Sequence, residues 1–389
     1  MRGPITGRLR AAIVGCGRIA QRHAAILRDL PDVQLVAMVD TRPERAEQFA
    51  REYGGRAYAA FGEMVSQEKP DLVNVCTPSG DHVSTALALI RAGVPNVIVE
   101  KPIALRLRDA DLMIEAADKA NARLFVVKQN RYNLPIVKLK EALDAGRFGR
   151  LVLGAIRVRW CRRQDYYDQA AWRGTWAMDG GVFSNQASHH VDMLVHMMGE
   201  VEEVSALTTT RLVTIEAEDT GIAMLRFRNG ALGVIEATTA ARPVDLEGSI
   251  SILGQNGTVE VGGFAMNEMK VWRFADPGSE DEGVLERYRT NPPDVYGFGH
   301  HEFLNQAVRA IQTGAAASID GREGRKSLEV ITAIYESSES GAPVAFPFTP
   351  RRSRLGVGGG RVSQIDTVSL PRVIVGPENG KQKKEIEEP

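Results

Sequence analysis

The feature that most constrains the fold is the segment 11–20, where a short apolar run breaks into Gly-x-Gly-x-x-Ala and continues with helix-forming residues. This break predicts a parallel strand, a tight turn at Gly15 and a helix that starts near Arg18. Gly17 leaves the backbone free to approach a pyrophosphate at the N-terminus of that helix. Because paired glycines at a strand end also serve plain strand–helix packing, the motif is weak by itself and needs its context.

A second apolar run over residues 33–39 ends at Asp40 and supplies that context. A carboxylate at this place accepts hydrogen bonds from both hydroxyls of an adenosine ribose and repels a 2′-phosphate, which predicts NAD rather than NADP. Arg42 is close enough to weaken this prediction, since guanidinium groups bind such phosphates. A helix-capping role for Asp40 is the alternative. The expected cofactor contacts of the turn are Gly15, Gly17, Arg18, Ile19 and Asp40.

Composition excludes several classes of partner. The 389 residues are 43% hydrophobic, enough for two domain cores. The net charge of −1 disfavours nucleic acid and anionic membranes as partners. Three widely spaced cysteines are typical of reduced thiols rather than of zinc or disulfide sites. No apolar run is long enough to span a bilayer, so we expect a cytoplasmic protein.

Two patterns of periodicity divide the chain. From residue 9 to about 129, strand-like runs alternate with helical patterns, which predicts a doubly wound parallel sheet of the Rossmann type. After residue 135, a long strand over 151–160 is followed by strands joined through Asn229-Gly230 and Asn256-Gly257, which are strong hairpin signals. We therefore expect a second α/β domain with a large open, mostly antiparallel sheet and helices on one face.

The expected domain limits follow from these patterns. The first domain covers residues 8–134 and binds the dinucleotide, and the second covers 135–348 and ends with a helix over about 325–339. Residues 349–389 are rich in Arg, Gly, Lys and Glu and form an extension with little capacity to build a core.

Two short motifs follow strands of the parallel sheet directly, where the ligands of such sheets bind. Thr77-Pro78 and His82 come after the strand that ends at Cys76, although His82 also fits an ordinary helix start. Glu100-Lys101-Pro102 follows the next strand. A lysine at a strand end is usually only solvated, but in a fold of this type we expect the Lys101 side chain to point toward the cofactor.

A third candidate region is a helix expected over 185–198. Asn185, His189, Asp192 and His196 recur at helical spacing and predict a polar stripe that needs a wet cleft. Gly180-Gly181 before it permits close approach of another group. Buried, hydrogen-bonded histidines are the alternative. We expect no metal, because three histidines without a carboxylate cluster make a poor site.

In this order the motifs resemble the Gfo/Idh/MocA family of NAD(P)-dependent oxidoreductases, over residues 9 to about 345. The resemblance implies hydride transfer at a sugar carbinol. The family's catalytic pattern is the lysine of Glu-Lys-Pro plus Asp-x-x-x-His, which Lys101 and His189 match, whereas Asn185 replaces the acidic residue. An amide orients an imidazole without supplying charge. Either His189 or Lys101 is therefore the base, with Asn185, His190 and Asp192 as support. The family contacts to the cofactor fall on Thr77, Pro78, His82, Glu100, Lys101, Gln129, Trp172 and Arg173.

A narrower resemblance lies in the segments 128–133, 159–162, 166–167, 172–176 and 185–190. They are similar to the members of this family that oxidise C3 of UDP-N-acetylglucosaminuronate (UDP-GlcNAcA) for bacterial surface polysaccharides. Such members recycle bound NAD with 2-oxoglutarate, and members of the family commonly form homo-oligomers. A nucleotide sugar acid also needs local arginines in a chain of near-zero charge. The expected substrate contacts are Lys101, Arg131, Tyr132, Arg159, Tyr166, Asn185, His189 and Tyr296. For Tyr296, an ordinary loop tyrosine is the alternative.

Two alternatives to this function remain. An inositol or free-sugar dehydrogenase of the same family would not need the arginine-rich segment 159–173. A catalytically silent NAD-binding regulator would share the fold, but the presence of Lys101 and His189 favours an enzyme.

Overall fold

The computed structural model describes residues 7–290, 297–316 and 319–358. Its first sheet has six parallel strands in the order β3-β2-β1-β4-β5-β6, as the alternating strand and helix pattern predicts. All but short β3 are built mainly of buried apolar residues, as is typical of a sheet covered on both faces. The strands are β1 (Leu9–Val14), β2 (Val33–Val39), β3 (Arg56–Tyr58), β4 (Leu72–Val75), β5 (Asn96–Val99) and β6 (Arg123–Val126).

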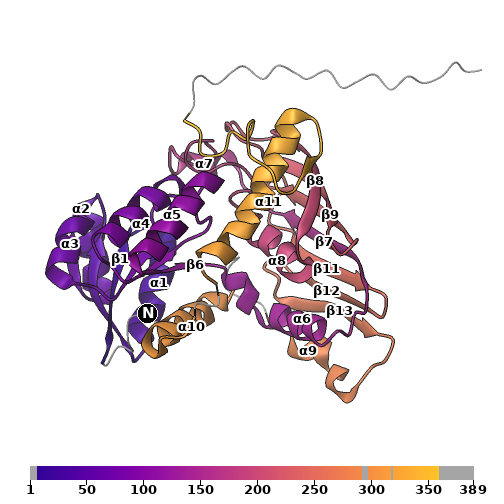
Figure 1. Cartoon of the computed structure of the whole chain (residues 1–389), viewed down its shortest axis with the longest axis horizontal. Coiled ribbons are helices and arrows are strands. Elements are labelled where there is room, and N and C mark those ends of the chain that lie inside the picture. Colours follow the sequence, from indigo (N-terminus) through magenta and orange to yellow (C-terminus); the bar gives the residue numbers. More distant parts are fainter. Residues whose placement is uncertain (1–6, 291–296, 317–318, 359–389) are drawn as a thin grey trace, which may run out of the picture. The chain divides into compact units, whose positions relative to one another are not determined.

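The helices of this layer lie on both sides of the sheet (Figure 1). One of them, α10, comes from near the far end of the chain and packs against α1. Its apolar residues Phe303, Leu304 and Val308 share a core cluster with the first strand. The sequence patterns did not place this helix. The helices are α1 (Arg18–Asp29), α2 (Pro43–Tyr53), α3 (Phe61–Glu68), α4 (His82–Arg91), α5 (Leu107–Ala120) and α10 (Gly299–Thr313).

The second sheet has eight strands in the order β13-β12-β11-β7-β10-β9-β8-β14. Every neighbouring pair is antiparallel except β7 and β10, so the expected mostly antiparallel sheet is confirmed. The two Asn-Gly segments join β9 to β10 and β11 to β12, as predicted. The strands are β7 (Leu151–Arg159), β8 (Val201–Thr209), β9 (Thr220–Phe227), β10 (Leu232–Thr238), β11 (Glu247–Gly254), β12 (Gly257–Gly262), β13 (Glu268–Phe274) and β14 (Val344–Ala345).

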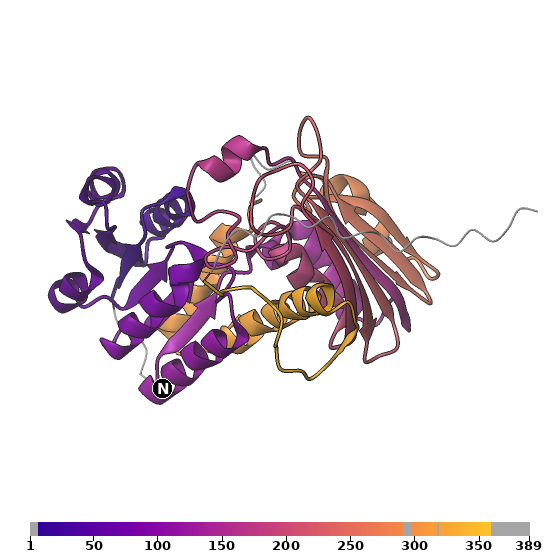
Figure 2. The same ribbon diagram turned by 90° about the horizontal axis from the view of Figure 1, so that it is seen from above.

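Helices α6 (Leu134–Asp144), α8 (Ser188–Met198) and α11 (Gly321–Ser340) contact strands of the second sheet. Helix α8 begins three residues later than expected, and α11 begins earlier because Asp320 caps it by accepting from the Glu323 N–H at 2.8 Å. Helix α11 also contacts β6 and α5, so it joins the two sheets (Figures 1 and 2). Shorter helices are α7 (Gln164–Asp168), α9 (Val284–Arg287), η1 (Ser79–Asp81), η2 (Gln129–Tyr132) and η3 (Ser279–Asp281).

The cores of the two sheets are continuous. One cluster of buried side chains contains Val75 and Val126 of the first sheet, Leu328 and Ile331 of α11, and Ile156 of the second sheet. None of the helices in the described ranges is both long and apolar enough to cross a membrane.

Candidate active site

The turn after β1 has the geometry that a dinucleotide requires. Gly15 adopts φ +94°, and a Cβ there would lie 2.7 Å from the main-chain carbonyl of Cys76, so no other residue fits. At Gly17, which precedes the first turn of α1, a Cβ would meet nothing within 4 Å. Open space beside a helix N-terminus without acidic side chains suits a pyrophosphate.

Asp40 stands at the end of β2 with its carboxylate held by the main chain. It accepts from the Cys16 N–H at 2.8 Å and from the Arg42 N–H at 2.9 Å. Helix α2 starts at Pro43 with Arg42 as its preceding residue and without a side-chain cap, so Asp40 is not the cap of that helix. Its carboxylate lies at the edge of the sheet where an adenosine ribose binds in this fold.

The segment after β4 offers one more polar group that a ligand could contact. The Thr77 hydroxyl is buried and has no hydrogen-bond partner among the described residues. His82 lies close by, but both of its ring nitrogens are engaged, 2.7 Å from the carbonyl oxygen of Pro102 and 3.0 Å from that of Thr77. His82 therefore ties together the two segments that follow β4 and β5, and it does so inside the protein.

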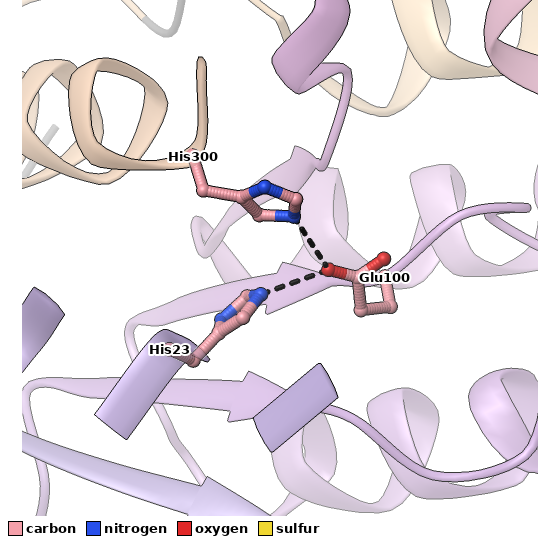
Figure 3. A group of neighbouring side chains, drawn as sticks. All are labelled: His23, Glu100 and His300. Atoms are coloured by element: carbon pink, nitrogen blue, oxygen red, sulfur yellow. Dashed lines mark hydrogen bonds and ion pairs between the residues drawn. The ribbon is translucent and has the colours of Figure 1, made fainter. Parts of the chain in front are cut away.

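Glu100 is buried, and its carboxylate points toward His23 and His300 (Figure 3). Its Oε1 lies 2.8 Å from Nε2 of His23 on α1 and 3.8 Å from Nε2 of His300 on α10. Burial alone would raise the pKa of Glu100, but the two histidines outweigh it and hold that pKa well below its usual range. Because Oε2 also accepts from the Lys101 N–H at 3.1 Å, this buried cluster sets the main-chain position of Lys101.

The same three side chains are the group in the described residues whose atoms are close enough to hold a metal ion. The Nδ1 atom of His23 lies 3.2 Å from Oδ1 of Asn74, so both of its ring nitrogens already have partners. This arrangement favours a hydrogen-bonded ion pair over metal coordination.

Lys101 extends from the end of β5 to the segment before α8. Its Nζ donates to the main-chain carbonyl of Asn185 at 2.8 Å and to the Asn185 Oδ1 at 3.3 Å. Burial lowers the pKa of Lys101, against the opposing charges of Glu100 and Asp179. An ammonium group has three N–H donors, so one remains for a ligand oxygen.

His189 lies on the first turn of α8, with its Nε2 2.9 Å from Nε2 of Gln129. Burial, together with the charges of Lys101 and Lys128, lowers the pKa of His189 well below its usual range. The imidazole is therefore neutral at physiological pH and can accept a proton. Its Nδ1 is buried without a hydrogen-bond partner in the described residues.

A third group, Asp179, was missed in the sequence although it directly precedes the Gly180-Gly181 pair. It is 1% exposed, and its Oδ1 accepts from Asn185 Nδ2 at 2.8 Å. Burial raises the pKa of Asp179 to about 6. Position 185 itself carries no acidic residue, but Asp179 places a carboxylate directly beside it.

A pocket of about 570 Å³ joins these elements, a volume typical of small-molecule sites. It reaches from Arg18 at the start of α1, past the lysine and histidine, to the segment around α7. Six of the expected site residues line it: Arg18, Lys101, Gln129, Tyr166, Asn185 and His189. The other lining residues are Asn130, Trp160, Cys161, Arg162, Arg163, Asp165, Gln169, Gln186, Asp245 and Phe264.

Arg131 and Asp192, expected at the site, form a buried ion pair outside this lining. The Nε atom of Arg131 donates to Asp192 Oδ2 at 2.7 Å, and its Nη1 donates to Glu323 of α11 at 2.9 Å. The positive charges of Lys128 and Arg131 hold the pKa of Asp192 below its usual range although burial opposes them. These carboxylates engage three of the five N–H donors of Arg131, which is not among the pocket-lining residues, so its substrate contact stays a prediction.

Three other expected site residues, Arg159, Tyr132 and His190, are not among the residues that line this pocket. Arg159 on β7 donates to both oxygens of Glu236 at 2.6 and 2.7 Å, and the Tyr132 ring packs on Phe303. The His190 ring packs against Trp160 and does not line the pocket. The predicted stripe does not form one wet face: Asn185 and His189 line the pocket, whereas Asp192 is buried in its pair with Arg131 and, like His196, is not among the lining residues.

The aromatic segment near α7 holds the last two predicted cofactor contacts. Arg173 lies over the Trp172 ring at 4.9 Å and the Tyr166 ring at 4.4 Å, and it donates to the Tyr166 hydroxyl at 2.5 Å. Neither Trp172 nor Arg173 is among the pocket-lining residues. Tyr296 lies outside the described residues.

Comparison with known proteins places this site in a family. The chain matches the oxidoreductase family with an NAD-binding Rossmann fold over residues 9–128 and its C-terminal alpha/beta domain over residues 140–346. The WlbA dehydrogenase of Chromobacterium violaceum, solved with NADH and UDP-GlcNAcA, is 42% identical, with 90% of this chain and 99% of that chain covered and a TM-score of 0.84. WlbA of Bordetella pertussis, solved with the same molecules, is 41% identical, with 88% and 100% covered and a TM-score of 0.82.

A curated relative of different specificity is also similar. Myo-inositol 2-dehydrogenase of Thermotoga maritima is 29% identical over 345 residues, which cover 85% of this chain and 96% of the relative. The family models together extend from β1 to β14. The chain therefore belongs to the Gfo/Idh/MocA family of oxidoreductases, and NAD is the cofactor of its first domain.

Proposed function

We propose that this enzyme oxidises the C3 hydroxyl of UDP-GlcNAcA to the 3-keto sugar, with NAD as oxidant, in the biosynthesis of surface-polysaccharide sugars. The observation that carries the proposal is one pocket that joins the dinucleotide turn at Arg18, the pair Lys101 and His189, and the arginines beside α7. A dehydrogenase needs its base, its proton relay and its cofactor turn on the same cavity.

The charge of the pocket supports an anionic substrate. Arg18, Lys101, Arg162 and Arg163 line it, against the carboxylates of Asp165 and Asp245. Arg162 already donates to Asp245 at 2.8 Å, whereas Arg18 and Arg163 are exposed. Guanidinium groups match the geometry of diphosphate and carboxylate oxygens, and UDP-GlcNAcA carries both. The two WlbA enzymes, each solved with this sugar nucleotide, are also more similar in sequence than the inositol dehydrogenase.

The residues divide the proton chemistry between them. Neutral His189 accepts the proton of the sugar hydroxyl, which its lowered pKa permits at physiological pH. Lys101 donates its remaining N–H to the same oxygen and stabilises the negative charge that develops there. NAD, when bound, supplies the acceptor for the hydride from C3. The amide N–H of Gln129 donates to His189 Nε2, which leaves the ring hydrogen on Nδ1, so Nε2 is the nitrogen that accepts the proton. When the substrate binds, its hydroxyl replaces the Gln129 N–H at Nε2.

We also propose that NADH is reoxidised in place by 2-oxoglutarate, which would become 2-hydroxyglutarate. The resemblance to the UDP-GlcNAcA dehydrogenases supports this step. The same pocket cations that suit a sugar acid also suit a dicarboxylate.

The test is product analysis and NADH absorbance with purified protein and UDP-GlcNAcA, with and without 2-oxoglutarate. UDP-GlcNAc and myo-inositol serve as controls, because the first lacks the carboxylate and the second lacks the nucleotide. A 3-keto product from the uronate alone is expected. Turnover of myo-inositol alone would instead support an inositol dehydrogenase, and no turnover with any substrate would support an NAD-binding regulator.

We propose in addition that the protein forms a homo-oligomer through the second sheet. Leu207, Ile222, Met224 and Val234 are large, exposed and adjacent across β8, β9 and β10. A contiguous apolar patch of this kind marks an interaction surface. Met224→Lys is expected to reduce the mass measured by light scattering, whereas Leu134→Lys, at an equally exposed position on α6, is expected to leave it unchanged. A monomeric wild-type protein would contradict the proposal.

A further inference from the structure

The Asn185 side chain connects Lys101 to a carboxylate behind the pocket wall. Its Nδ2 donates to Asp179 Oδ1 at 2.8 Å, while its Oδ1 accepts from Lys101 Nζ at 3.3 Å. Asp179 is fully buried and is not among the pocket-lining residues. A chain of hydrogen bonds therefore runs from the protein interior to the lysine head group.

Asp179 decides which way the Asn185 carboxamide faces. An ionised carboxylate only accepts hydrogen bonds, so it takes the NH₂ group and leaves the carbonyl oxygen for Lys101. The opposite orientation would direct N–H groups at an ammonium. The second oxygen of Asp179 accepts from the Gly174 N–H at 2.9 Å, which keeps the carboxylate from rotating away.

The charge of Asp179 also matters for Lys101. The charged groups that act on this lysine are Glu100 and Asp179 on the acidic side and Lys128 and Arg173 on the basic side. Glu100 is already shared between His23 and His300. Asp179 is therefore the carboxylate whose side chain reaches the lysine through a single intervening residue.

We infer that Asp179 is a positioning residue for Lys101. Acting through Asn185, it orients the lysine head group toward the reacting oxygen and supplies, one hydrogen bond further away, the negative charge that position 185 lacks. The inference rests on the proposed role of Lys101 in the oxidation.

The experiment is a swap of the two side chains. Asp179→Asn keeps the shape and the acceptor for Gly174 but frees the Asn185 amide to turn, so kcat is expected to fall about tenfold or more with little change in KM. The double variant D179N/N185D moves the carboxylate to position 185, where it accepts directly from Lys101 and from the new amide. Recovery of most of the wild-type kcat is expected.

The matched control is Asp219→Asn. Asp219 is also fully buried and accepts from the N–H groups of Arg211 and Leu212, but no hydrogen bond among the described residues joins it to Asn185 or Lys101. It is expected to lower thermal stability and to leave kcat unchanged. If D179N retains the wild-type kcat, or if the double variant falls as far as D179N, the inference is wrong.

A second readout does not depend on turnover. Amine-specific acetylation of Lys101, followed by peptide mass spectrometry over a range of pH, reports the pKa of its ammonium. Loss of the Asp179 charge is expected to move the midpoint to lower pH in D179N and back in the double variant. The other titratable groups that face Asp179 are the same in both variants as in the wild-type protein. They are Lys101, Arg173, Tyr167 and Glu218.

These readouts separate the two proposals. Failure of the wild-type protein to oxidise any sugar would contradict the proposed function, while the acetylation midpoints would still test Asp179. Wild-type turnover with an unshifted midpoint and an unimpaired D179N would contradict only the role of Asp179.

Discussion

Lys101 and Asn185 are 84 positions apart in the chain, yet Nζ of the lysine lies 2.8 Å from the main-chain carbonyl of the asparagine. This contact joins the end of β5 to the segment that leads into α8. The carbonyl belongs to the backbone, so it anchors the lysine whatever side chain occupies position 185. The side chain at 185 then adjusts the direction and the charge of the site.

Replacement of Lys101 by Met is expected to reduce kcat by about 10²- to 10⁴-fold, because the developing oxyanion loses its charged donor. NAD binding is expected to persist, since the turn at Gly15 and Gly17 is untouched. Initial rates from NADH absorbance, with cofactor binding from fluorescence quenching, check both expectations. Lys119→Met, on the exposed face of α5, is the matched control. Wild-type turnover in Lys101→Met would remove the lysine from the mechanism.

Asp40→Ser is expected to weaken the binding of NAD and to strengthen the binding of NADP. The carboxylate that repels a 2′-phosphate is lost in this variant, while Arg42 remains nearby. A hydrogen bond to a charged group is worth about 1.5–3 kcal/mol, so KM for NAD is expected to rise about tenfold or more. Steady-state kinetics with both cofactors measure the change. An unaltered preference for NAD would show that Asp40 does not contact the ribose.

Arg163→Ala is expected to raise KM for the sugar nucleotide about threefold to tenfold, since an exposed guanidinium on the pocket wall loses its pairing with the anion. The effect is expected to shrink at high salt. Arg228→Ala is the control, because Arg228 pairs with Glu200 and does not line the pocket. Equal KM values for the two variants would argue against this arginine as a substrate contact.

His190 is expected to make the protein less stable in acid. Burial lowers its pKa to about 3, below the value of about 6.5 for a histidine in an unfolded chain. Between these values the unfolded chain binds the extra proton. The contribution of neutral, buried His190 to the free energy of unfolding is therefore fully present above about pH 6.5, and it is lost as pH falls toward 3.

His190→Leu is accordingly expected to flatten the dependence of Tm on pH between 6.5 and 4, with turnover unchanged because the ring packs on Trp160 outside the pocket. Differential scanning fluorimetry across this range gives the slope. The control is His301→Leu at an exposed position on α10. A loss of turnover in His190→Leu would support the prediction that His190 assists catalysis.

Much of the fold could be predicted from local patterns. The apolar run before Gly15, the carboxylate after β2 and the lysine after β5 all follow from one rule, because the carboxyl ends of parallel strands meet at one edge of the sheet. The Asn-Gly turns located two hairpins of the second sheet for a similarly local reason. The helix α10 could not be assigned in this way, since its return to α1 depends on the path of the whole chain.

The sequence by itself determined the strand ends and turns, and with them Gly15, Asp40 and Lys101, because short-range sterics and hydrophobic periodicity specify those features. Only the tertiary structure decided the partners of the charged groups. Arg131 pairs with Glu323 across 192 positions, and Asp179 reaches Lys101 through Asn185. Hydrogen bonds and ion pairs act over a few ångströms in space, and no local periodicity records which distant residues the fold brings within that range.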